Sequence, residues 1–120
     1  MKDNIIKDKS FKFALKIIKL YQFISEEKKE YVLSKQVLRS GTAVGALVEE
    51  AVQAESKADF IHKLSIANKE ANETHYWLKL LKESGYLEEN IANSIFKDCT
   101  EVIKIITSII NTSKLKISKK

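Results

Sequence analysis

The sequence predicts an all-α protein, an antiparallel up-down-up-down four-helix bundle. Its 120 residues contain no proline and only 3 glycines, although turns and strand edges normally use both. Apolar side chains also return every three or four residues along almost the whole chain, as they do on one face of an α-helix. This length suits one domain with its own core. We therefore expect residues 1–120 to form a single domain with a basic tail from about residue 113.

The first predicted helix has two neighbouring apolar faces. One face contains Phe11, Leu15 and Ile18, and the other contains Phe13, Ile17, Leu20 and Ile24. Ser10 is a plausible cap within this stretch, because a serine hydroxyl can accept a hydrogen bond from an N–H of the first turn. The charged residues 25–29 are expected to connect this helix to the next.

The second predicted helix runs from about residue 30 to 55, and small residues crowd its centre. Gly41 and Gly45 lie there, and a glycine inside a helix costs about 1 kcal/mol relative to alanine. A neighbouring helix that approaches closely would offset this cost. We therefore expect tight packing against this part of the helix.

The last two predicted helices are bounded by turn signals and carry regular apolar patterns. Ser56 followed by Asp59 resembles a capping box, and Gly85 is placed to end the third helix. The fourth helix, about residues 88–112, carries two apolar stripes where a helix of a lone bundle needs one. We therefore expect a homo-oligomer that uses this helix and also the first. The candidate interface residues are Phe96, Ile103, Ile106 and Ile110.

Charge is concentrated at the two ends of the chain. The net charge is +5, made of +4 in residues 1–24, −3 in residues 25–112 and +4 in the last eight residues. Short connections make successive helices antiparallel, so both basic segments should meet at one end of the bundle. Clustered lysines suit a polyanion such as RNA, although they also serve solubility. The candidate nucleic-acid contacts are Lys9, Lys12, Lys16, Lys19, Lys114, Lys116, Lys119, Lys120 and Arg39.

Arg39 has a second interpretation. It is the only arginine, and it lies as far before the turn near Ser56 as Glu73 lies after it. An ion pair of Arg39 with Glu73 or Glu70 would fix the register of the second and third helices. The alternative is an arginine that contacts RNA.

The sequence predicts no enzyme, metal or cofactor. A di-iron bundle needs Glu-x-x-His on two helices, but His62 and His75 share one helix and Asn72 stands three residues before His75. Cys99 lies among isoleucines, where a thiol behaves as a small apolar group. A lone cysteine and the absence of a long apolar run favour the cytoplasm and no membrane.

The central helices resemble the "four helix bundle protein" family, whose members include proteins encoded in intervening sequences of bacterial 23S ribosomal RNA genes. The resemblance begins with the run from Gln36 to Ala46 and continues at Glu50-Ala51. Further matching positions are Asp59-Phe60, Lys63-Leu64, Lys69-Glu70-Ala71, Glu73-Thr74 and Trp77-Leu78. Two departures are Leu47, where asparagine is expected, and the missing proline between the first two helices.

The resemblance implies a homopentamer without enzyme activity. The family is similar to the accessory protein of diversity-generating retroelements, a basic pentamer that binds nucleic acid and a reverse transcriptase. We therefore expect a non-enzymatic homo-oligomer that binds RNA or another nucleic acid, with a protein as a further candidate partner. The alternative is a structural or protein-interaction scaffold that binds no nucleic acid.

Overall fold

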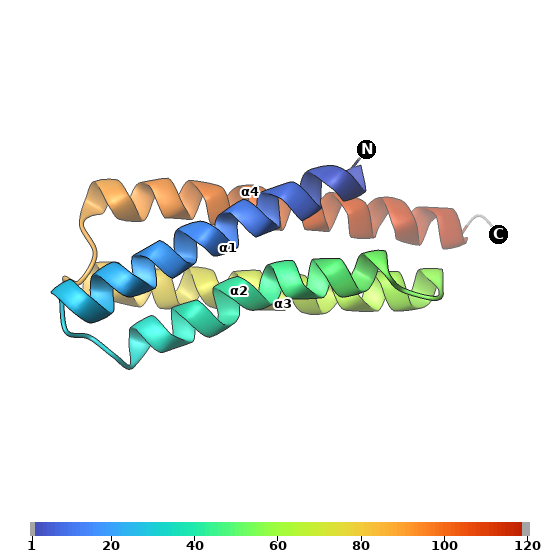
Figure 1. The fold of residues 1–120 in the computed structure, drawn as a ribbon. Coiled ribbons are helices and arrows are strands. Elements are labelled where there is room, and N and C mark those ends of the chain that lie inside the picture. The colour runs from blue at the N-terminus through green and yellow to red at the C-terminus, as the bar shows by residue number, and fades with distance from the viewer. Residues whose placement is uncertain (1, 119–120) are drawn as a thin grey trace.

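The described part of the chain folds into four helices. In the computed structural model, the backbone is described for residues 2–118 and side chains for residues 5–117. The helices are α1 (Lys2–Glu27), α2 (Leu33–Val52), α3 (Lys57–Glu83) and α4 (Glu89–Ser118). Successive helices run in opposite directions and pack side by side, and α1 also packs against α4 (Figure 1). The predicted up-down-up-down bundle is confirmed.

Both predicted ends of α3 are confirmed. The Ser56 hydroxyl accepts a hydrogen bond from the Asp59 N–H at 3.1 Å, which satisfies one of the free N–H groups of the first turn. After the last turn, Gly85 adopts a φ of +87°, a conformation that glycine enters without steric penalty. These local signals therefore fix where α3 begins and ends.

The start of α2 differs from the prediction. The helix begins at Leu33, and the Glu30 carboxylate accepts hydrogen bonds from the N–H groups of Val32, Leu33 and Ser34 at 2.8–3.0 Å. Desolvation of Glu30 opposes its ionisation, but the hydrogen bonds from these N–H groups outweigh it, and the pKa of Glu30 is lowered. Glu30 is thus a capping residue outside α2 and does not form its first turn.

The start of α1 also differs, because Ser10 is not a cap. The helix continues from Lys2 through Ser10, whose buried hydroxyl donates to the Lys7 carbonyl at 3.3 Å. At its other end α1 continues to Glu27, so the connection consists of residues 28–32 and not 25–29. Lys29 adopts a φ of +55° in this connection.

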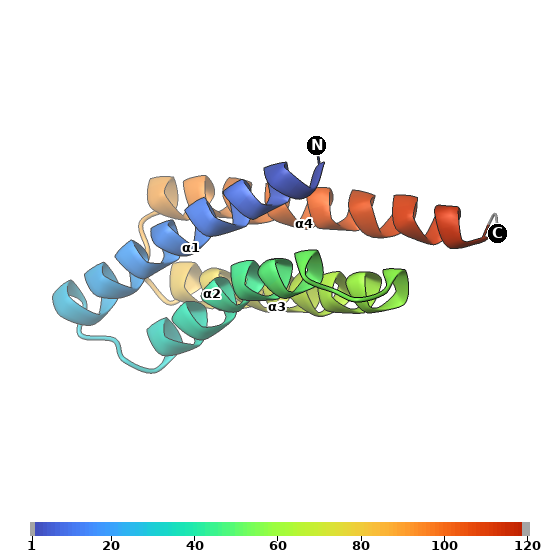
Figure 2. The same ribbon diagram turned by 45° about the vertical axis from the view of Figure 1, so that its right-hand side comes forward.

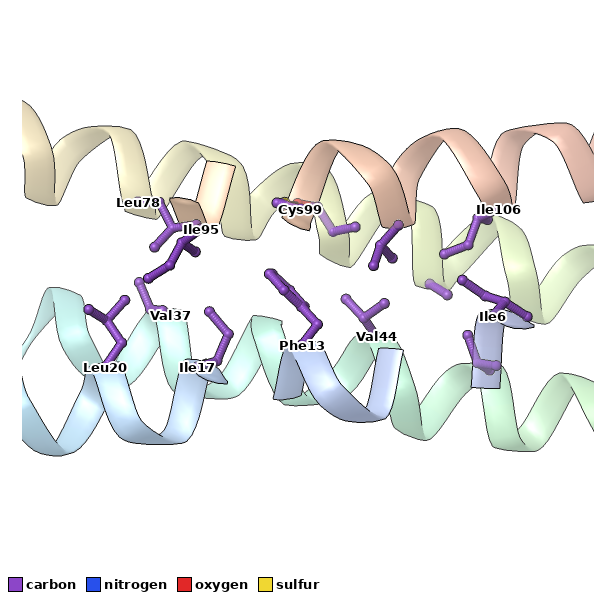
Figure 3. Close-up of a cluster of buried hydrophobic side chains, with 14 of the residues drawn as sticks. Ile6, Phe13, Ile17, Leu20, Val37, Val44, Leu78, Ile95, Cys99 and Ile106 are labelled. Atoms are coloured by element: carbon purple, nitrogen blue, oxygen red, sulfur yellow. Dashed lines mark hydrogen bonds between the residues drawn. The ribbon is translucent and has the colours of Figure 1, made fainter. Parts of the chain in front are cut away.

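The core forms one cluster along the axis of the bundle. Side chains from all four helices point toward one another, including Phe13, Val44, Leu78 and Ile106 (Figure 3). The expected close approach at the α2 glycines is confirmed. A Cβ added at Gly41 would lie 2.8 Å from two carbons of Ile17, and one added at Gly45 would lie 3.3 Å from the Ser10 carbonyl oxygen.

The two apolar stripes of α4 are largely used within the protomer. Ile106 is fully buried and Ile110 is only 8% exposed, so the prediction that these two residues form an oligomer interface is wrong. Phe96 stacks on His75 of α3 with ring centroids 4.9 Å apart, and Ile103 is half-buried against the core. The broad apolar face of α4 exists because the helix packs against both α1 and α3.

The end of α4 extends past the prediction. The helix continues to Ser118, about two turns beyond residue 112, and it reaches past the turn between α2 and α3 (Figure 2). None of the described helices combines the length and apolarity needed to cross a membrane.

Candidate nucleic-acid interface

Three of the four α1 lysines predicted to contact phosphate are ion-paired. The pairs are Lys9 with Glu101 at 3.0 Å, Lys16 with Asp98 at 2.5 Å, and Lys12 with Asp8 at 3.0 Å. The hydrogen bond from Lys9 to Glu101, together with the attraction of that carboxylate, raises the pKa of Lys9. A phosphate group would have to displace a carboxylate to reach these lysines. Lys19 is exposed and has no such partner among the described residues.

The paired lysines border a hollow between α1 and α4. Its volume is about 160 Å³, and buried Phe13 and Val102 form part of its lining. Two of the ion pairs cross from α1 to α4 here, and Lys16 also donates to the Ser94 hydroxyl at 2.7 Å. We call this region the α1–α4 seam; it consists of Lys9, Phe13, Lys16, Ser94, Asp98, Glu101 and Val102.

The two basic segments of the chain do not both gather at one end of the bundle, because residues 1–24 cover most of α1 (Lys2–Glu27) and their lysines are spread along it. The start of α1 and the end of α4 lie on the same side of the molecule (Figure 1). Lys114 and Lys116 are exposed on the last turns of α4. The predicted contacts Lys119 and Lys120 lie outside the described residues.

The predicted ion pair of Arg39 is confirmed, and it involves both glutamates. Arg39 Nη1 lies 3.1 Å from Glu70, Nη2 contacts Glu73, and Nε donates to Gln36 at 3.2 Å. The hydrogen bond to Glu73 is the main reason that the pKa of Arg39 is raised. Most donors of this guanidinium are directed at protein acceptors, which favours the structural interpretation of Arg39.

A buried polar contact lies beneath Arg39 and joins the same two helices. Ser40 and Thr74 are both fully buried, and their hydroxyl oxygens are 2.8 Å apart. Ser40 also donates to the Gln36 carbonyl, and Thr74 lies 2.7 Å from the Glu70 carbonyl. We call this region the α2–α3 seam; it consists of Gln36, Arg39, Ser40, Glu70, Glu73 and Thr74.

Four lysines that the charge analysis did not single out are exposed on α3 and α4. Lys69, Lys79, Lys97 and Lys104 have no ion-pair or hydrogen-bond partner within the described residues. The sequence contained a signal for them, because Lys97 and Lys104 are seven residues apart and share a helix face. Counting net charge by segment concealed it, since residues 25–112 are acidic overall.

An apolar face of α1 is exposed on the side away from the core. Phe11 is 63% exposed, Leu15 is 47% exposed and Ile18 is 36% exposed. Their spacing of four and three residues places them in one row. This row is a better candidate for an assembly surface than α4, where the buried stripe serves the protomer.

The histidines and Cys99 form no reactive cluster. His62 is exposed and His75 packs on Phe96. In the described part of the chain, no three histidine, cysteine or acidic side chains gather as a metal site would require. Cys99 donates to the Ala71 carbonyl at 3.3 Å, and burial raises the pKa of its thiol to about 12.

The chain is similar to known proteins over nearly its whole length. The sequence profile of the 23S rRNA-intervening sequence protein family matches residues 2–108. A crystal structure of a protein with unknown function, from the S23 ribosomal protein family of Bacteroides thetaiotaomicron VPI-5482, has a TM-score of 0.91 and 56% sequence identity. That similarity covers 92% of this chain and 99% of the other. No curated protein matches the chain. The chain therefore belongs to the 23S rRNA-intervening sequence protein family.

Proposed function

We propose that this protein is a non-enzymatic, self-assembling module that binds RNA in the cytoplasm. The observation that carries the proposal is the separation of charge. Residues 1–24 and the last eight residues each carry +4 while residues 25–112 carry −3. The first of these segments covers most of α1, and the start of α1 points to the same side of the molecule as the end of α4 (Figure 1). Basic charge along α1 and at this end would attract a polyanion.

Lysine side chains at this end would contact phosphate groups and would not read bases. Lys114 and Lys116 are exposed on the last turns of α4, and the end of that helix reaches past the α2–α3 turn (Figure 2). Lys19 and the paired lysines of α1 would contribute a second strip, at the expense of their ion pairs. Binding of this type is sequence-independent and weakens steeply with salt.

Assembly would multiply these contacts. The exposed row Phe11, Leu15 and Ile18 supports self-association, because contiguous apolar side chains on a soluble protomer often mark an interface. A homopentamer is the assembly that the family resemblance implies. Several basic ends held on one particle would bind a long RNA more tightly than one end alone.

The direct test is fluorescence anisotropy of a labelled structured RNA at about 50 and 200 mM salt. Several phosphate contacts should weaken binding by about 10²-fold or more over this range. Replacing Lys114 and Lys116 with glutamine should lower the affinity and reduce the salt dependence. Absence of binding at the lower salt concentration would refute the proposal.

A structural or protein-interaction scaffold is the second candidate function. It is favoured by the ion pairs of Lys9, Lys12 and Lys16, which leave these lysines little freedom to contact phosphate. A scaffold would assemble through the Phe11 row and ignore RNA. Sedimentation of the Phe11→Glu variant separates these roles, because a scaffold would lose its assembly while showing no RNA affinity before or after the change.

A further inference from the structure

Four of the seven carboxylates of α3 and α4, those in the middle of each helix, are held at the seams with α2 and α1. Between residues 60 and 82 the only acidic residues are Glu70 and Glu73, and both pair with Arg39 of α2. Between residues 90 and 120 the only acidic residues are Asp98 and Glu101. These two pair with lysines of α1. Both seams therefore remove negative charge from the middle of the outer side of α3 and α4, while the exposed Glu83 and Glu89 remain at the turn between the two helices.

A row of exposed polar and basic side chains remains on each of these helices. On α3 the row is Lys69, Asn72, Tyr76 and Lys79, and on α4 it is Lys97, Thr100 and Lys104. Steps of three and four residues keep the members of each row on one helix face. We call the two rows together the α3–α4 lysine face.

The two rows belong to neighbouring helices. Asn68 of α3 donates to the Thr107 hydroxyl of α4 at 3.3 Å, and His75 of α3 stacks on Phe96 of α4. Each of these contacting residues is next in sequence to, or one turn away from, a member of the face. Lys97 and Lys104 are separated by about 10 Å along α4, at 1.5 Å per residue. The lysines thus follow the helix axes toward the basic end of α4.

Tyr76 adds an aromatic surface to this face. Its side chain is 55% exposed and lies between Lys69 and Lys79 on the same side of α3. An edge contact with the neighbouring Trp77 ring, with centroids 5.3 Å apart, limits its motion. Lysines that track a backbone together with an exposed aromatic ring for stacking are the combination found where proteins bind single-stranded nucleic acid.

We propose that the α3–α4 lysine face binds single-stranded RNA, with Lys69, Lys79, Lys97 and Lys104 contacting phosphates and Tyr76 stacking on a base. The inference rests on the proposed RNA-binding function and moves its main surface away from α1. The four lysines can contact phosphate without giving up an ion pair, whereas Lys9, Lys12 and Lys16 cannot. The face leads to Lys114 and Lys116, so a strand could continue onto the basic end.

The test compares two full-length variants that lose the same charge. One replaces Lys69, Lys79, Lys97 and Lys104 with glutamine. The matched control replaces four exposed lysines outside both proposed binding surfaces with glutamine, namely Lys28, Lys29, Lys35 and Lys57. The probe is a labelled oligouridylate of about 20 nucleotides, a length that spans more than one site of a typical single-strand binder. Anisotropy is measured at several salt concentrations, and circular dichroism establishes that each variant is helical.

The face variant should bind the oligouridylate about 100-fold more weakly at about 50 mM salt. The slope of log affinity against log salt should fall by about 3, since each lost contact on a single strand contributes roughly 0.7. The control variant should stay within about threefold of the wild type. Equal losses of affinity in both variants would show that RNA binding depends only on the net charge of the protein, and this result would overturn the inference.

Two further outcomes separate this inference from the proposed function. If the wild type binds and the face variant binds as well, the face is not the site, although the protein still binds RNA. If the wild type does not bind at low salt, the proposed function fails and the inference fails with it. Tyr76→Leu should weaken binding about tenfold without changing the salt slope, and an unchanged affinity would remove the stacking role of Tyr76.

Discussion

The α2–α3 seam and the α1–α4 seam use similar charged residues in different settings. In the α2–α3 seam, Arg39 holds two glutamates above a fully buried contact between Ser40 and Thr74. In the α1–α4 seam, single lysine–carboxylate pairs border a hollow of about 160 Å³. Buried hydrogen bonds hold the α2–α3 seam together, whereas ion pairs at the surface hold the α1–α4 seam together. We therefore expect α1 to separate from α4 more readily than α2 separates from α3.

The difference follows from chain topology. A short turn joins α2 to α3, so their register is set locally and polar groups can be matched in the interior. Helices α1 and α4 are the first and last of the chain, so no turn sets their register. Surface lysines tolerate small errors of register because their side chains are long and flexible. Both seams nevertheless draw carboxylates inward from α3 and α4, which leaves the α3–α4 lysine face basic.

Alkylation of Cys99 tests whether opening of the weaker seam reaches the core, and it has the largest expected effect. Burial raises the pKa of the Cys99 thiol to about 12, roughly three units above an ordinary thiol. The native protein should therefore react with iodoacetamide at about pH 8 roughly 1,000-fold more slowly than the unfolded chain. Mass spectrometry measures the rate.

Cys99 could become exposed when α1 alone moves away or only when the whole protein unfolds. Its thiol donates to the Ala71 carbonyl of α3, so movement of α1 alone should leave it protected. The alkylation rate should then follow global stability across a series of urea concentrations. Added salt screens the α1–α4 ion pairs. If the alkylation rate rose with salt while the global stability stayed the same, the view that α1 separates without α4 leaving α3 would be contradicted.

Gly41→Val should cause the largest loss of stability. A Cβ at Gly41 would lie 2.8 Å from two carbons of Ile17, which is itself fully buried. Overpacking of this kind should lower the free energy of unfolding by about 2 kcal/mol, measured by urea denaturation. Ala46→Val, at an exposed position of the same helix, should cost only about 0.5 kcal/mol through helix propensity.

A second substitution identifies the cause of that loss. Ile17→Ala removes the carbons that the new side chain would meet, so the double variant should be more stable than the sum of the single effects predicts by about 1 kcal/mol. Strict additivity would mean that Gly41 is needed for a reason other than its contact with α1. In that event the close contact between Gly41 and α1 would not be the cause of the loss of stability.

The fold could be predicted from the sequence because its signals are local. The period of apolar residues placed the four helices, and the Ser56 and Gly85 signals placed the ends of α3. The ends of α1 and α2 were less predictable. Ser10 has the chemistry of a cap but lies inside a helix that continues past it, and Glu30 caps α2 from outside with a side chain that can also occupy a helix.

The candidate interface was less predictable, because charge depends on which residues meet across the bundle. A spacing of three and four residues put Lys9, Lys12 and Lys16 on one face, but it could not show that α4 presents Asp98 and Glu101 opposite them. The ion pair of Arg39 was predictable from its distance to the α2–α3 turn. The two apolar stripes of α4 were misassigned for the same reason, since Ile106 faces the protomer's own core.

Glu30→Gln should destabilise the start of α2, with a pH dependence that identifies the carboxylate. The folded-state pKa of Glu30 is lowered, so its contribution is present above the unfolded pKa of about 4.5 and is lost as pH falls through the folded value. At pH 7 the variant should lose about 1 kcal/mol of unfolding free energy. The difference from the wild type should vanish in strong acid, whereas Glu27→Gln, at the exposed end of α1, should change little at any pH.

Glu101→Gln should have the smallest effect on stability, and that effect should depend on salt. Exposed lysine–carboxylate pairs contribute little and are screened by ions, so Tm should fall by a few degrees at low salt and by no measurable amount in about 0.5 M NaCl. Hydrogen exchange should locate the change in α1, with the amides of α2 and α3 unaffected. Faster exchange in α2 as well would mean that the two seams open as one unit. Loss of an ion pair in the α1–α4 seam should speed exchange in α2 only if the whole protein unfolds.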